Sequence, residues 1–236
     1  MRVFLVLICV LVLGPLFAQE SQADYQLNRA VDFLEAGELR PAKKWARKSL
    51  KNDPEDPGVH YVLGDIYLLK QKEKRALAFF ERSRALYPEY ALTQYKLGVC
   101  HLRLGEEDRA MDYLNRALTI DSSLADARLT RAFIHIENGR TEAAFEDLDS
   151  VLFFDMLNPE AFKQRGLLHI ENHAFAEAES DLSACLALRP DDGDALYHRG
   201  VARIELGKRT AGCADLRAAQ RLFHPQAPRL LKSYCR

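Results

Sequence analysis

A unit of 34 residues recurs six times along this chain, and this period restricts the possible folds more than any other feature. Small residues occupy one column of the repeat, at Ala30, Gly64, Gly98, Ala132, Gly166 and Gly200. A second small column follows at Ala42, Ala76, Ala110, Ala144, Ala178 and Gly212. A fixed period of this length predicts an array of stacked units, in which small residues allow neighbouring backbones to approach closely.

Each unit has the pattern of a helical hairpin. Apolar residues recur at helical spacing in two runs, as in Ile66 and Tyr67 followed by Leu77 and Phe80. A break separates the runs, at Gly37, Gln71, Gly105, Gly139, His173 and Gly207. Glycine can adopt the left-handed conformation that ends a helix, so the sequence predicts a tight turn at each break.

Such a unit resembles the tetratricopeptide repeat: Leu-Gly or Arg-Gly lies in the first helix, Ala and Phe or Leu lie in the second, and a proline often closes the unit. The resemblance implies an all-α fold, a right-handed superhelical solenoid of six helix-turn-helix repeats plus a C-terminal capping helix. The expected repeats within residues 23–226 are 23–56, 57–90, 91–124, 125–158, 159–192 and 193–226, and the capping helix is 227–236. In this family the first helices line a concave groove that binds peptides or protein surfaces.

The predicted groove carries an apolar stripe with tyrosines as candidate anchors. Its residues are Tyr61, Asp65, Tyr95, Val99, Leu129, Phe133, Lys163, Leu167, Tyr197 and Val201. Exposed apolar area of this extent marks a binding surface. Two alternatives stay open: tight curvature could bury the stripe, or the inward face could lie one column away. The leading hypothesis is a non-catalytic interaction module or assembly scaffold in the cell envelope, with a protein or peptide partner of unknown identity.

Residues 1–18 are typical of a signal peptide. Arg2 precedes an apolar run over residues 3–13, a Gly14-Pro15 break follows, and Ala18 is the expected cleavage site. We therefore expect an exported protein of bacterial type, in the periplasm or at the cell surface. An uncleaved anchor is the alternative, and only then would the chain contact the membrane.

Four cysteines follow the signal segment, and export predicts an oxidising environment for them. Cys100 and Cys185 fall in columns typical of buried small residues. Cys213 lies in the last repeat, and Cys235 ends an amphipathic segment whose Leu230, Leu231 and Tyr234 could cover that repeat. We predict a disulfide between Cys213 and Cys235.

Two further columns hold arginine and aspartate in the last three units. Arg131, Arg165 and Arg199 are followed sixteen residues later by Asp147, Asp181 and Asp215, whereas leucine and an aromatic residue take these places in the second and third units. We expect the two columns to touch and to form partly buried ion pairs. Whether each aspartate reaches the arginine of its own unit or of the next one stays open.

Three histidines, His101, His135 and His169, form a ladder with the repeat spacing. The alternative function is a metal- or pH-responsive envelope protein that uses this ladder, because imidazole titrates near neutrality and binds transition metals. The structural interpretation is a set of core aromatic residues with polar tips. Helix-packing distances of about 8–10 Å would keep the rings too far apart for one tetrahedral ion.

Other functional classes lack support in the sequence. The charge is balanced, with 33 basic and 34 acidic residues, so no nucleic-acid partner is expected. Gly-rich phosphate loops, nucleophile elbows, His-Glu-x-x-His and Cys-x-x-Cys motifs do not occur. We therefore expect no enzyme activity, no catalytic or metal-binding residues, no cofactor and no small-molecule substrate.

Overall fold

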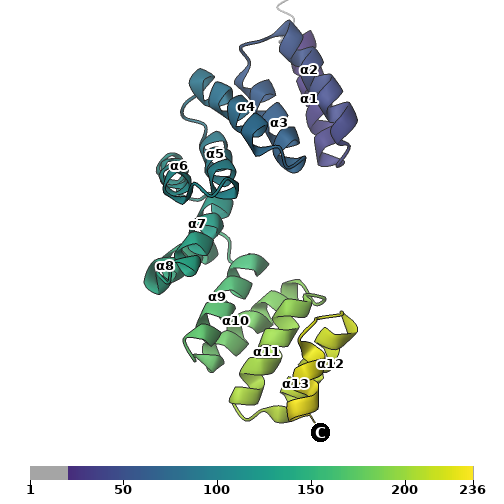
Figure 1. Ribbon diagram of the computed structural model, residues 1–236, viewed down its shortest axis with the longest axis vertical. Coiled ribbons are helices and arrows are strands. Elements are labelled where there is room, and N and C mark those ends of the chain that lie inside the picture. Colours follow the sequence, from purple (N-terminus) through teal and green to yellow (C-terminus); the bar gives the residue numbers. More distant parts are fainter. Residues whose placement is uncertain (1–20, 236) are drawn as a thin grey trace, which may run out of the picture. The chain divides into compact units, whose positions relative to one another are not determined.

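The computed structural model describes residues 21–235, which form thirteen α-helices and contain no strand within that range (Figure 1). This confirms the predicted all-α class. The predicted signal peptide, residues 1–18, lies outside the described residues. The chain divides after Leu86 into two compact units, which we describe separately.

The first unit contains two helical hairpins. Its helices are α1 (Gln22–Glu35), α2 (Leu39–Asn52), α3 (Pro57–Leu69) and α4 (Glu73–Leu86). Helix α1 packs against α2, α3 packs against α4, and α2 also contacts α3, so each hairpin buries its apolar face on its neighbour. Ala30, Ala42, Ala46 and Leu63 lie in the resulting core.

The second unit contains four hairpins and a final single helix. Its helices are α5 (Ala91–Arg103), α6 (Glu107–Ile120), α7 (Ala125–Glu137), α8 (Thr141–Phe154), α9 (Pro159–Glu171), α10 (Phe175–Leu188), α11 (Gly193–Glu205), α12 (Arg209–Arg221) and α13 (Ala227–Tyr234). Each odd-numbered helix from α5 to α11 is the first helix of a hairpin and packs against the helix that follows it. Helix α13 packs against α12.

All six turns inside the hairpins use the left-handed backbone conformation that the sequence predicted. The φ angle is 74° at Gly37 and 76° at Gly105, and it is also positive at Gly139 and Gly207. Gln71 and His173 adopt the same conformation at φ 53° and 58°, although their side chains make it less favourable. The repeat geometry therefore overrides local preference at these two turns.

The small columns permit close contact between the two helices of a hairpin. A Cβ atom at Gly64 would lie 2.6 Å from the ring of Phe80 on the opposite helix. A Cβ atom at Gly212 would lie 2.7 Å from the carbonyl oxygen of Gly200. The small residues that recur every 34 positions therefore lie where the two helices of a hairpin cross most closely.

Candidate partner-binding site

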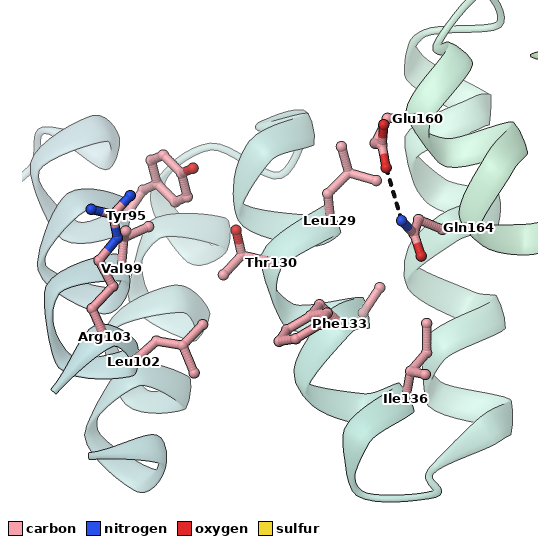
Figure 2. Close-up of a pocket in the computed structure, with 11 residues that line it drawn as sticks. Tyr95, Val99, Leu102, Arg103, Leu129, Thr130, Phe133, Ile136, Glu160 and Gln164 are labelled. Carbon is pink, nitrogen blue, oxygen red and sulfur yellow. Dashed lines mark hydrogen bonds between the residues drawn. The ribbon is translucent and has the colours of Figure 1, made fainter. Parts of the chain in front are cut away.

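A pocket of about 350 Å³ lies between three first helices of the second unit, α5, α7 and α9 (Figure 2). Its lining residues are Tyr95, Val99, Leu102, Arg103, Leu129, Thr130, Ala132, Phe133, Ile136, Glu160 and Gln164. Four residues of the predicted groove meet here: Tyr95, Val99, Leu129 and Phe133. The volume is sufficient for a large apolar side chain of a partner.

Helical spacing places the apolar walls on one side of their helices. Tyr95 and Val99 are four residues apart on α5, and Leu129 and Phe133 have the same spacing on α7, so each pair lies on one face. The side chain of Phe133 is 50% exposed, which is unusual for a phenylalanine in a folded core. An exposed aromatic residue beside an apolar pocket is typical of a protein-binding surface.

The wall formed by α9 is polar. Gln164 Nε2 donates a hydrogen bond to Glu160 Oε1 over 2.8 Å (Figure 2). Glu160 Oε2 also pairs with Lys163 Nζ at 3.1 Å and with Arg189 Nη1 at 3.4 Å. The charge of Glu160 is therefore largely compensated within the chain. Neither Glu160 nor Gln164 belongs to the groove predicted from the sequence, although Gln164 directly follows Lys163, which does.

The other predicted groove residues do not line the pocket that Tyr95, Val99, Leu129 and Phe133 form part of. Lys163 Nζ lies 3.2 Å from Asp192 as well as close to Glu160. Burial alone would lower the pKa of Lys163, but the bonds to the two carboxylates outweigh burial and raise it. Leu167 and Val201 are half-buried on α9 and α11.

Tyr197 belongs to a buried contact at the C-terminal end of the second unit. Its side chain is only 9% exposed, and its ring stacks on that of His224 with centroids 4.1 Å apart. Tyr61 and Asp65 lie on α3 of the first unit, where Tyr61 packs edge-on against Phe80. None of these three residues lines the pocket.

The predicted arginine–aspartate pairs are confirmed, and each aspartate meets the arginine of its own hairpin. Arg131 reaches Asp147 at 2.6 Å, and Arg199 reaches Asp215 at 2.8 Å. Each arginine also donates to the preceding hairpin, as Arg131 does to Asn115 Oδ1 over 2.7 Å. These side chains join neighbouring repeats and lie outside the pocket lining.

The ladder histidines contact carboxylates and aromatic rings. His101 Nδ1 lies 2.8 Å from Glu106, and this bond lowers the pKa of that carboxyl group. His101 also stacks on Tyr113 with ring centroids 5.2 Å apart, and His169 packs against Phe145. Within residues 21–235, no group of three or more His, Cys, Asp or Glu side chains is placed to hold a metal ion.

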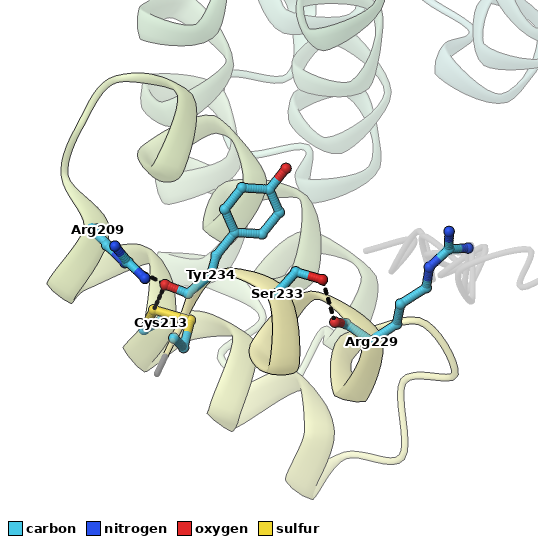
Figure 3. The surroundings of a disulfide bond; sticks show 6 residues. Arg209, Cys213, Arg229, Ser233 and Tyr234 are labelled. Atoms are coloured by element: carbon cyan, nitrogen blue, oxygen red, sulfur yellow. Dashed lines mark hydrogen bonds between the residues drawn. A yellow bond between two sulfur atoms is a disulfide. The ribbon is translucent and has the colours of Figure 1, made fainter.

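Cys213 and Cys235 are joined by a disulfide bond, with their Cα atoms 5.6 Å apart (Figure 3). The bond connects α12 to the residue that follows α13, and the carbonyl oxygen of Tyr234 accepts a hydrogen bond from Arg209 Nε. Leu230 and Leu231 of α13 pack on the core of the α11–α12 hairpin. Tyr234 stays 43% exposed, so it contributes less to this cover than predicted.

Cys100 and Cys185 are buried, as predicted, and neither belongs to a disulfide. No helix within residues 21–235 is long and apolar enough to span a membrane.

Known proteins share this architecture. A tetratricopeptide-repeat family model matches residues 27–91 and 75–125. The PilF structure from Pseudomonas aeruginosa superposes with a TM-score of 0.82 at 14% identity, over 89% of this chain and 96% of that one. PilW, described as a widely conserved type IV pilus biogenesis factor, superposes with a TM-score of 0.77 at 19% identity, over 89% and 99%.

A chain of the APC/C hetero-tetramer Cut9-Hcn1 also superposes, with a TM-score of 0.77 at 15% identity, over 89% of this chain and 42% of that one. The present chain therefore spans less than half the length of that relative. No curated protein is similar enough in sequence to count as a match.

The array of stacked helical hairpins defines the class of helical-repeat proteins. Within that class, the chain resembles tetratricopeptide-repeat proteins, because residues 27–125 match the family model and the similar solved structures share the fold. Proteins of this family bind peptide or protein partners and are generally non-catalytic modules.

Proposed function

We propose that the pocket between α5, α7 and α9 binds an apolar side chain of a protein partner, so that the chain serves as an interaction module or assembly scaffold. The observation that carries this proposal is the half-exposed ring of Phe133 beside an open apolar pocket. Leaving such a ring in water is unfavourable, and a partner that covers it would gain the free energy of burial. Tyr95 supplies a second aromatic anchor on the facing helix.

The proposed contact surface is narrower than the stripe predicted from the sequence. It centres on Tyr95, Val99, Leu129 and Phe133, which line one pocket. Tyr197 is left out because His224 covers its ring. Lys163 is left out as an anchor because its ammonium group is held by Glu160 and Asp192.

A pair of substitutions tests the pocket. Tyr95→Ala with Phe133→Glu should reduce capture of the native partner by at least about tenfold, because each lost anchor typically costs more than 1 kcal/mol of binding free energy. Helical circular dichroism should stay unchanged. Capture is measured by crosslinking in intact cells followed by mass spectrometry.

The matched control makes the same chemical changes outside the pocket. Tyr87→Ala with Phe153→Glu alters a tyrosine that is 50% exposed and a phenylalanine that is 79% exposed. This control should retain partner capture. Equal capture by the pocket variant and the control would overturn the proposed site.

The proposed location is the bacterial cell envelope. The signal-like residues 1–18 support export, and so does the pairing of Cys213 with Cys235, because disulfides persist in oxidising compartments. The fold shared with the pilus biogenesis factor PilW is compatible with this location. Fractionation tests it: the full chain should appear outside the cytoplasm, and a variant that lacks residues 2–18 should stay inside.

A further inference from the structure

Three first helices of the second unit end on an exposed glutamate. These residues are Glu137 on α7, Glu171 on α9 and Glu205 on α11, one in each of three consecutive repeats. Within residues 21–235, none of these three carboxylates forms a hydrogen bond or an ion pair. Together they form a row of negative charge along the hairpin turns.

Helix stability does not explain this acidic row. The C-terminal end of a helix carries partial negative charge, so a carboxylate at the last helical position is unfavourable there and a basic residue would be preferred. A feature that opposes local stability in three successive repeats without internal compensation indicates a role in binding.

An apolar row lies one helical turn before the acidic row. Its members are Phe133, Leu167 and Val201, each four residues before a glutamate and therefore on the same face of its helix. Helices α7 and α9 share one apolar core, and α9 contacts α11. The two rows therefore run side by side across the three helices.

A second acidic row borders the apolar row at the other end of the helices. It consists of Asp126, Glu160 and Asp194, each eleven residues before a glutamate of the first row. Glu160 is compensated by Lys163 and Arg189, and Asp194 lies 3.3 Å from His224. In this row only Glu160 is paired with lysine and arginine, and Asp126 forms no ion pair within residues 21–235, whereas all three carboxylates on the turn side lack a basic partner there.

The distance between the two acidic rows is large enough for a helix to lie between them. Eleven residues at a rise of about 1.5 Å per residue separate the rows by about 16 Å along each helix. A helix with its side chains is about 10–12 Å wide. A helical segment that lies across α7, α9 and α11 therefore fits between the rows, with its borders close to the carboxylates.

We infer that the partner presents a basic amphipathic helix, whose apolar face covers Phe133, Leu167 and Val201 and whose lysine or arginine side chains pair with Glu137, Glu171 and Glu205. This inference rests on the proposed function and specifies the chemistry of its partner. Charge complementarity selects this occupant, because an acidic segment would meet like charge at Glu137, Glu171 and Glu205.

Binding of defined peptides to the full chain tests the inference. The probe is a helix-forming peptide with leucine and phenylalanine on one face and lysine along both borders, and two matched peptides carry glutamine or glutamate in place of lysine. The lysine peptide should bind about three- to hundredfold more tightly than the glutamine peptide, since three exposed ion pairs contribute about 0.2–1 kcal/mol each, or about 0.6–3 kcal/mol together. Its affinity should fall as salt concentration rises.

Charge-removing variants locate the interaction. The triple variant Glu137→Gln, Glu171→Gln and Glu205→Gln should bind the lysine peptide about tenfold more weakly and should lose most of the salt dependence. The matched control Asp112→Asn, Glu146→Gln and Glu177→Gln removes three exposed carboxylates from the second helices α6, α8 and α10. It should bind the lysine peptide like the unmodified chain.

Two results would overturn the inference: equal affinity for the lysine and glutamine peptides, or an unchanged affinity in the triple glutamate variant. The proposed function would survive either result if Tyr95→Ala with Phe133→Glu still abolished capture of the native partner. Conversely, the triple variant could lose binding of the lysine peptide while the pocket variant still captures the native partner. This result would support the acidic surface as a binding site and exclude the pocket.

Discussion

The guanidinium group of Arg165 donates hydrogen bonds to both carboxylate oxygens of Asp181, each over 2.8 Å, from the opposite helix of the same hairpin. Its remaining nitrogen, Nη1, reaches Asp149 of the preceding hairpin at 2.6 Å. The bond to Asp181 raises the pKa of Arg165, so the pair stays ionised. One side chain thus fixes the geometry within a repeat and joins it to its neighbour.

Breaking this pair should destabilise the second unit. Asp181→Ala leaves a mostly buried guanidinium group without its main partner. We expect the free energy of unfolding to fall by about 2–3 kcal/mol. This is less than the loss for a fully buried pair, because the Arg165 side chain is 24% exposed. Chemical denaturation measures the loss.

The chain itself supplies the control. The double variant Arg165→Leu with Asp181→Tyr copies the Leu97 and Tyr113 pair of the third repeat. Its free energy of unfolding should lie within about 1 kcal/mol of that of the unmodified protein, because an apolar pair can often replace an ion pair without loss of stability. If this double variant were as unstable as Asp181→Ala, the ion pair would stabilise the folded state by more than the mutual compensation of its two charges.

Gly212→Ala should destabilise the last hairpin by about 1–3 kcal/mol. The new Cβ atom would lie 2.7 Å from the backbone oxygen of Gly200, which cannot move without shifting α11. Gly193→Ala is the matched control, since its Cβ atom would meet Leu222 at an ordinary 3.5 Å. Thermal unfolding of both variants checks the difference, and equal midpoints would contradict the close-approach argument.

Removing the disulfide with Cys213→Ser and Cys235→Ser should lower the free energy of unfolding by about 3 kcal/mol in the loop-entropy model. Denaturation with and without reductant measures the loss, and reductant should have no effect on the double variant. Alkylation of unreduced, denatured protein provides a second check. It should label the thiols of Cys100 and Cys185 and leave Cys213 and Cys235 unmodified.

In the native protein, Cys185 should react slowly with an alkylating reagent. Burial shields the side chain and raises the pKa of its thiol, so little reactive thiolate forms near neutral pH. A labelling rate equal to that of denatured protein would show that α10 opens readily.

Stability should decrease as the pH falls below about 6.5, the ordinary pKa of histidine. Burial lowers the pKa of His198, and the nearby His224 lowers it further. The unfolded chain therefore binds this proton more tightly than the folded chain, and the contribution of His198 is complete above pH 6.5 and declines below it. Burial gives His135 a shift of the same sign.

The variant His198→Gln should show a smaller loss of stability between neutral and mildly acidic pH than the unmodified protein. Denaturant midpoints at several pH values measure the difference. His173→Gln, which alters an exposed histidine in a turn, is the control and should keep the full pH dependence. An identical pH dependence in all three proteins would exclude His198 as a contributor.

Much of the fold could be predicted from the sequence because each repeat is a local structure. Gly64, Gly98 and their equivalents lie at close helix crossings, and Gly105 lies in a left-handed turn. The same position in each repeat therefore has the same structural role, which the period alone predicts. The arginine–aspartate columns could be matched for the same reason. Which aspartate each arginine reaches depends on the distance between helices, and this was not visible in the sequence.

The binding surface could be predicted only in part. The period identifies the inner column, but Tyr95 and Tyr197 occupy equivalent places in it and have different environments. Tyr95 lines the pocket, whereas the turn after α12 places His224 on the ring of Tyr197. That turn lies at the end of the array, where no further repeat follows within residues 21–235, so the repeat pattern says nothing about it.

The sequence by itself determined the class of fold, the helical hairpins and the paired columns, because these follow from short-range periodicity and from residue size. Only the tertiary structure decided which inner residues stay accessible and which helices leave a pocket between them, because exposure depends on atoms that approach from other repeats. It also showed that the carboxylates of Glu137, Glu171 and Glu205 have no partner among residues 21–235. Outside the periodic arginine and aspartate columns, the order of residues along the chain does not reveal whether a carboxylate has a partner, because pairing depends on positions in space.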